Sequence, residues 1–222
     1  MIEALSPSLP IALALALSPA PILALIIILM TPQAKKNVLF YMVGWYLGII
    51  AVAIVVFVMP GINNGQTEGG RFLPMAQLSL AALFLGTAVW KWIHRPRKGD
   101  PIHTPKLFRH LDELGRFQSM FMGFALSGLN IKNIALIVAG ALTIQFASAY
   151  GSIAVLSLLA FALVATGALL MVVAIYYLRR SQIDPVFARW KRWLIKHNNT
   201  ILIVILIVFG SILLKKGLES IW

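Results

Sequence analysis

The stretch "FALSGLNIKNIALIV", residues 124–138, decides how this chain folds. It places Asn130, Lys132 and Asn133 near the middle of an apolar segment that we expect to span residues 118–144. Lys132 would then lie about 12 residues, or roughly 18 Å, from either end of its helix. A lysine side chain does not reach the membrane surface from there, and burying its charge costs about 3 kcal/mol on insertion scales. Charges at such a depth mark substrate or ion pathways.

The composition around this stretch is that of a membrane protein. The chain has 222 residues, of which 60% are hydrophobic and only 12% are charged, which is more apolar than an ordinary soluble domain. A helix needs roughly 20 apolar residues to cross a bilayer. We therefore predict an all-α membrane protein with six transmembrane helices, at about 9–30, 38–59, 75–93, 118–144, 151–178 and 199–216.

The basic residues predict the orientation of these helices. Most of them lie in connections 31–37, 94–117 and 179–198, whereas 60–74 carries only Arg71 and 145–151 carries none. Because cytoplasmic loops hold the excess of lysine and arginine, we predict that both termini face outside. The start has no positive charge and its apolar run continues to Met30, which favours a first span over a signal peptide.

Two cytoplasmic segments, 104–117 and 184–198, are predicted to form amphipathic helices. In the second, Asp184 is a candidate N-cap and Pro185 suits the first helical position. Three aromatic residues, Phe187, Trp190 and Trp193, then interleave with four basic ones. We expect these helices to lie at the membrane interface and anchor the loops. The alternative is that they recruit anionic lipid head groups.

The chain divides into two halves of three spans each. Residues 1–93 form the first three-helix repeat, 94–117 the cytoplasmic linker, and 118–222 the second repeat, which includes 184–198. Because each half holds an odd number of spans, the halves run in opposite directions, as in an inverted repeat. "ALSPAPILAL" (16–25) and "ALSGLNIKNIAL" (125–136) lie midway through spans one and four.

Both of these central stretches contain helix breakers. Pro19 and Pro21 lack a backbone N–H, and Ser18 is suited to cap a new half-helix with Pro19 at its first position. In span four, Gly128 loosens the helix and Asn130 is suited to cap the second half. We therefore predict that spans one and four are broken near the midplane, as is tolerated where the freed backbone faces protein or a wet cavity.

The predicted breaks bring positive charge together. The N-termini of both second half-helices would lie near the midplane, each with about half an elementary charge from its dipole. Lys132 lies beside one of them, so the simplest ligand is an anion such as a carboxylate or phosphate. In the alternative interpretation, Lys132 only donates to unwound carbonyls. The candidate substrate-binding residues are Ser18, Pro19, Pro21, Ser127, Asn130, Lys132 and Asn133.

Several function classes find no support in the sequence. There are no cysteines, the four histidines lie in polar connections, and no nucleophile–base pair, phosphate loop or metal cluster is evident. We therefore expect no enzyme, no cofactor and no metal. The seven acidic residues lie in loops or near span ends. Most basic residues behind the net charge of +12 fall in particular loops without a recognition motif, so we expect no nucleic-acid partner. "GWYLG" (44–48) is a small-xxx-small motif for close helix packing.

The chain resembles the GAP family, which is related to mycobacterial glycopeptidolipid- and sulfolipid-addressing proteins and belongs to the lysine exporter (LysE) superfamily. The resemblance is carried by residues 16–48, by "HTPKLFRHLDEL" (103–114), by "ALSGLNIKNIALIVAGALTI" (125–144) and by "KRWLIKHNNTILIVILIVFG" (191–210). It implies two inverted repeats with paired central breaks, and export of amino acids in the superfamily or of cell-envelope glycolipids in this branch. The family reads Asn-Pro-Lys-Asn in span four, where this chain has Ile131 instead of proline.

Three functions follow as hypotheses. The first is a transporter that moves an anionic amphiphile, such as a glycolipid or lipid-linked precursor, from the inner to the outer leaflet. The second is an exporter of amino-acid-like solutes in which Lys132 holds the carboxylate. The third is an accessory subunit of a lipid export assembly that transports nothing itself. We expect a multi-pass protein of the bacterial cytoplasmic membrane whose partners are membrane lipids and an anionic lipid or small-molecule substrate; a homodimer is left open.

Overall fold

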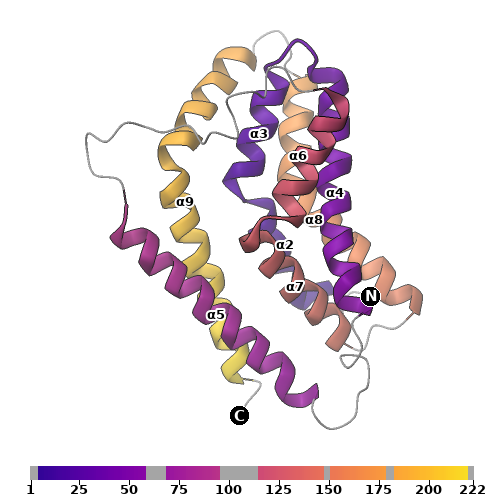
Figure 1. Ribbon diagram of the computed structural model, residues 1–222, viewed down its shortest axis with the longest axis vertical. Helices are drawn as coiled ribbons and strands as arrows, with labels where there is room; N and C mark the ends of the chain where they lie inside the picture. The colour runs from indigo at the N-terminus through magenta and orange to yellow at the C-terminus, as the bar shows by residue number, and fades with distance from the viewer. Residues whose placement is uncertain (1–4, 59–68, 96–114, 148–150, 179–182, 220–222) are drawn as a thin grey trace.

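The computed structural model describes residues 5–58, 69–95, 115–147, 151–178 and 183–219, and every regular element in these residues is a helix (Figure 1). The elements are a short 3-10 helix η1 (Ser6–Ser8), α2 (Leu9–Ala16), α3 (Pro19–Leu29), α4 (Ala34–Val58), α5 (Gly69–Ile93), α6 (Arg116–Gly128), α7 (Ile131–Phe146), α8 (Gly151–Leu178) and α9 (Ile183–Glu219). The predicted all-α class is confirmed, and each of the six predicted spans overlaps one helix or one bent pair in the described residues.

The lengths and composition of these helices are those of a multi-pass membrane protein. Three stretches are long and apolar enough to cross a bilayer: Ala34–Val58, Gly151–Leu178 and Pro185–Glu219. Each of the bent pairs α2–α3 and α6–α7 is also long and apolar enough to cross a bilayer if its two helices form one span. The described chain therefore has up to five candidate spans. Residues Gln77–Ile93 of α5 form a shorter apolar helix. Large apolar side chains are exposed on the outer faces of the long helices, as expected for surfaces that face lipid.

Both predicted breaks are present. The first pair bends by 52° between Ser6–Ala16 and Pro19–Leu29, and the second bends by 65° between Arg116–Gly128 and Ile131–Phe146. The second break forms without the family proline, because Asn130 is extended (φ −82°, ψ 115°) and caps a new helix. A capped restart therefore suffices to separate α6 from α7.

The small-xxx-small motif packs α4 directly on α6. A methyl group added at Gly44 would overlap the Met120 carbonyl, and one added at Gly123 would overlap the Tyr41 carbonyl. Gly48 lies against the Ser127 side chain in the same way. The two backbones are therefore in contact, which only glycine permits, and the predicted close helix packing is confirmed.

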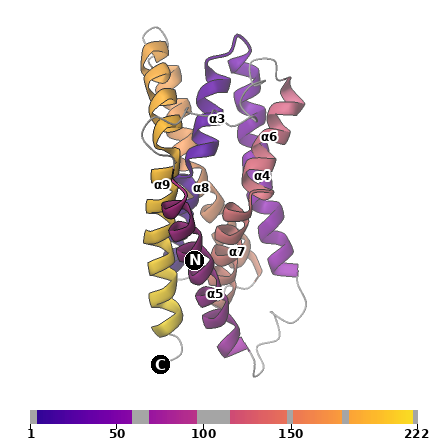
Figure 2. The same ribbon diagram turned by 60° about the vertical axis from the view of Figure 1, so that its left-hand side comes forward.

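Helices α5 and α9 run side by side along one edge of the molecule, and α7 also contacts α5 (Figures 1 and 2). The sequence prediction of a separate interfacial helix at 184–198 is wrong, since α9 is one helix from Ile183 to Glu219. No proline or glycine lies between Pro185 and Gly210, so nothing interrupts the helix. Asp184 lies inside α9 instead of preceding it. The predicted amphipathic helix at 104–117 lies almost wholly outside the described residues, which resume at Gly115.

Candidate functional site

The Lys132 ammonium group joins the two breaks. Its Nζ donates a hydrogen bond of 2.8 Å to Ser18 Oγ, across 114 residues of sequence. Ser18 is the residue that precedes α3, and Lys132 lies in the first turn of α7. The predicted meeting of two half-helix N-termini at Lys132 is therefore present in the structure.

Ser18 does not do what the sequence predicted of its side chain. It occupies the N-cap position, with Pro19 first in the helix, but its side chain makes no capping hydrogen bond. An N-cap side chain bonds the N–H of the second or third helical residue; the third here is Pro21, which has none, so Ala20 offers the one remaining donor. The Ser18 hydroxyl instead accepts from Lys132, so the capping prediction is wrong for this residue.

Asn130 and Asn133 stabilise the second break. Asn130 Oδ1 accepts from the Lys132 backbone N–H at 3.2 Å, which confirms the predicted N-cap. Asn133 is fully buried, and its Nδ2 donates to the Leu126 carbonyl at 2.7 Å. An uninterrupted helix would pair that carbonyl with the Asn130 N–H, so Asn133 satisfies an acceptor that the break set free.

A pocket of about 320 Å³ opens beside this junction. Three of the predicted site residues line it: Ser18, Asn130 and Lys132. The other lining residues come from the same two breaks and from α5 and α9: Ala20, Ile131, Leu83, Phe84, Thr87, Lys91, Asn198, Leu202 and Leu206. The pocket thus combines cationic and amide groups, from the breaks and from α5 and α9, with aliphatic and aromatic side chains of α5 and α9.

The remaining predicted site residues lie in the surrounding scaffold and do not line the pocket. Pro19 and Pro21 are buried, and the Pro21 carbonyl accepts a hydrogen bond of 2.9 Å from the Tyr41 hydroxyl. The Ser127 hydroxyl lies 3.1 Å from the carbonyl oxygens of both Gly123 and Phe124, within the α4–α6 contact. These residues hold the breaks in place, whereas Lys132 presents its charge at the pocket.

Sequence reasoning missed the contribution of Lys91. Lys91 lies near the end of the predicted span 75–93, yet it lines the same pocket as Lys132. Leu83, Thr87 and Lys91 are spaced by four residues and so share one face of α5, and all three line the pocket. That spacing was the available signal, but nothing in the sequence indicated that this face of α5 meets the breaks.

The pocket suits a negatively charged group. The one salt bridge among the described residues joins Lys215 and Glu219, so neither Lys132 nor Lys91 has a carboxylate partner there. The dipoles of α3 and α7 add partial positive charge. Within the described chain no group of three or more metal-ligating residues forms.

Helix α3 contributes few hydrogen-bond donors of its own. A helix leaves its first N–H groups without partners inside the helix. In α3 the Ser18 N–H bonds the Leu15 carbonyl, and Pro19 and Pro21 have no N–H. Ala20, which lines the pocket, supplies the remaining one. Anion binding at this site therefore depends on the Lys132 side chain more than on a cradle of backbone donors.

A comparison with protein families places the chain in one family. The family described as Sap, sulfolipid-1-addressing protein, matches residues 9–219. The chain belongs to this family. The match confirms the resemblance to the group of glycolipid-addressing proteins, and it identifies a membrane Sap-family protein tied to lipid handling. Comparisons with curated proteins and with solved structures give no match.

Proposed function

We propose that this Sap-family protein transports an anionic amphiphile, a cell-envelope glycolipid or lipid-linked precursor, from the inner to the outer leaflet of the bacterial cytoplasmic membrane. One observation carries the proposal. Lys132 lies at the junction of two broken helices, without a carboxylate partner among the described residues, in the wall of a pocket that is otherwise largely apolar. A cation so placed is costly unless it serves a ligand.

The pocket has the chemistry of an amphiphile site. Lys132 and Lys91 would bind a phosphate, sulfate or carboxylate through charge-assisted hydrogen bonds. Leu202, Leu206 and Phe84 would contact the adjoining apolar part of the molecule. A volume of about 320 Å³ is at the lower end for ligand pockets, which fits a head group with the chains left in the bilayer.

The helix contacts support two inverted repeats of three spans. Exchanging the halves maps α2 on α6, α3 on α7, α4 on α8 and α5 on α9. Under this exchange the contact of α4 with α6 corresponds to that of α8 with α2, and the contact of α3 with α9 to that of α7 with α5. Both members of each pair are in contact. From this proposal follow six spans with both termini outside. Alternating access would then occur by movement of one repeat against the other.

Two other functions are alternatives that the experiment below distinguishes from lipid transport. In a small-solute exporter, Lys132 would hold the carboxylate of an amino-acid-like molecule. In an accessory subunit, Lys132 would serve only to join the breaks, and the complex would tolerate its loss. The apolar walls from α5 and α9 favour the amphiphile, because a water-soluble amino acid gains little from them.

The test is mass spectrometry of the lipids and metabolites that co-purify with the protein and with Lys132→Met, at equal folded yield. We expect a lipid with an anionic head group that is depleted at least tenfold in the variant, since a hydrogen bond to a charged group contributes about 1.5–3 kcal/mol. Lys216→Met is the matched control, because Lys216 is also partly buried and donates to a carbonyl, that of Pro7. An unchanged lipid profile in Lys132→Met would reject the amphiphile site, and a depleted amino-acid-like metabolite would favour the solute exporter.

A further inference from the structure

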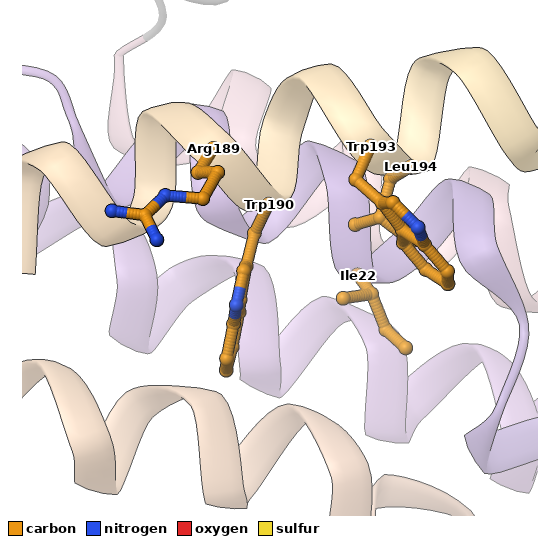
Figure 3. Close-up of a pocket in the computed structure, with 5 residues that line it drawn as sticks. All are labelled: Ile22, Arg189, Trp190, Trp193 and Leu194. Atoms are coloured by element: carbon orange, nitrogen blue, oxygen red, sulfur yellow. The ribbon is translucent and has the colours of Figure 1, made fainter.

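A second pocket lies beside the first, between α3 and the basic end of α9. It has a volume of about 440 Å³ and is lined by Ile22 of α3 and by Arg189, Trp190, Trp193 and Leu194 of α9. Figure 3 shows the two tryptophans and Leu194 projecting from α9 on the side where Ile22 lies, with the Arg189 guanidinium at one end. We call these five residues the α3–α9 groove.

The groove and the Lys132 pocket follow each other along α9. On α9, Leu194 lines the groove and Asn198 lines the pocket, about one turn or 6 Å further on. On α9, Trp190 and Leu194 of the groove and Asn198 and Leu202 of the pocket are spaced by four residues, so one face of this helix lines both. A molecule that moves along this face of α9 from the groove therefore approaches the junction of the breaks.

The chemistry of the groove favours one occupant, an anionic lipid. Arg189 presents a planar guanidinium that suits a phosphate or sulfate head group. Trp190 and Trp193 are partly exposed, and tryptophan concentrates where head groups meet acyl chains. The facing helix α3 (Pro19–Leu29) carries no charged residue, so the groove combines an apolar wall for an acyl chain with a cationic end.

We propose that the α3–α9 groove is a lateral portal through which an anionic lipid leaves the leaflet at the basic end of α9 and reaches Lys132. This inference rests on the proposed function. Arg189 makes the first contact with the head group, and Lys91 and Lys132 receive it in the pocket. The head group moves along the groove while the acyl chains extend past its apolar α3 wall into the bilayer.

The absence of cysteine from the chain allows a direct test of passage. Cysteines introduced together at Ile22 and Leu194 would be the only thiols, and a bismaleimide would then bridge the two sides of the groove. We expect cross-linked protein in vesicles of phosphatidylglycerol and phosphatidylcholine to retain about a tenth or less of the anionic lipid that uncross-linked protein of the same variant retains. The same reagent applied to either single-cysteine variant is the control. Undiminished loading of the cross-linked protein would overturn the portal.

Head-group selection at the groove is tested by tryptophan quenching. Vesicles of fixed phosphatidylglycerol and phosphatidylcholine content carry dibrominated chains on one lipid or the other. The signal of Trp190 and Trp193 is the difference between the protein and its Trp190→Phe/Trp193→Phe variant. We expect stronger quenching by brominated phosphatidylglycerol, with the preference falling about fivefold in Arg189→Gln, the effect of one basic residue at an anionic lipid surface.

Arg192→Gln is the matched control, because Arg192 is an exposed arginine on the same part of α9 that does not line the groove. In Arg192→Gln the preference for quenching by brominated phosphatidylglycerol should change less than twofold. Equal quenching by both lipids, or equal effects of the two arginine variants, would refute the role of Arg189. Lys132→Met should keep the quenching preference at the groove while losing the co-purified lipid. Failure of the portal thus leaves the Lys132 result intact, and failure of the Lys132 site leaves the groove result intact.

Discussion

The backbone contact between α4 and α6 predicts a large difference between two glycine substitutions. Gly123→Ala would place its methyl group on the Tyr41 carbonyl and 2.8 Å from the Trp45 nitrogen, where ordinary van der Waals contact begins at 3.4 Å. Both obstacles are backbone atoms of α4, so a rotamer change does not relieve the overlap. The helices must move apart instead.

The size of the effect follows from two opposing terms. Overpacking a tight interface costs about 1–3 kcal/mol, and even a gap of about 0.5–1 Å forfeits a quarter to a half of the dispersion energy at the contact. Alanine recovers about 1 kcal/mol of helix propensity over glycine. We therefore expect a net loss of up to about 2 kcal/mol, which lowers the unfolding midpoint by up to about 8 °C for a domain of this size.

The matched control is Gly167→Ala in α8, where an added methyl group meets nothing within 4 Å. It gains helix propensity without overlap, so its midpoint should stay level or rise. The assay is thermal unfolding in detergent, followed by tryptophan fluorescence at one scan rate for all three proteins. A midpoint for Gly123→Ala at or above that of Gly167→Ala would show that α4 and α6 are not in backbone contact.

Three further substitutions test the breaks through the same unfolding assay. Asn130→Ala removes the N-cap of α7 and should cost about 0.5–2 kcal/mol, and no loss would mean that the cap is unimportant. Tyr41→Phe removes the hydrogen bond to the Pro21 carbonyl and should cost about 1 kcal/mol, whereas an unchanged midpoint would argue against that bond. Ile131→Pro should be neutral or stabilising by up to about 1 kcal/mol, because Ile131 is the first residue of α7 and Asn130 before it is already extended. Clear destabilisation would refute the capped restart.

The breaks could be located from the sequence because their causes are local. Pro19 and Pro21 lack N–H groups whatever surrounds them, and Asn130 caps a helix that starts at the next residue. The cost of a lysine in lipid likewise identified Lys132 before any contact was known. The glycines at 44 and 48 predicted a close helix contact but not that α6 would be the partner.

The predictions that failed depended on what a side chain meets. The sequence predicts Ser18 as the cap of α3, but its hydroxyl accepts from Lys132 instead, because a distant ammonium lies within reach and Pro21 leaves only one N–H for a cap. Segment 184–198 was expected to lie apart at the interface, but it continues into the span since no breaker follows it. Its first turns lie against α3, where they form one side of the groove.

By itself, the sequence determined that the chain is a helical membrane protein, that two of its spans break near their centres, and that one break carries a lysine. These features follow from composition and from backbone chemistry within a few residues. Only the tertiary structure decided that Ser18 faces Lys132, that Lys91 and Asn198 complete the pocket, and that α9 lines a second pocket one turn away. Those juxtapositions depend on how helices far apart in the chain pack, and that is set by the shape of whole helix faces and not by any local run of residues.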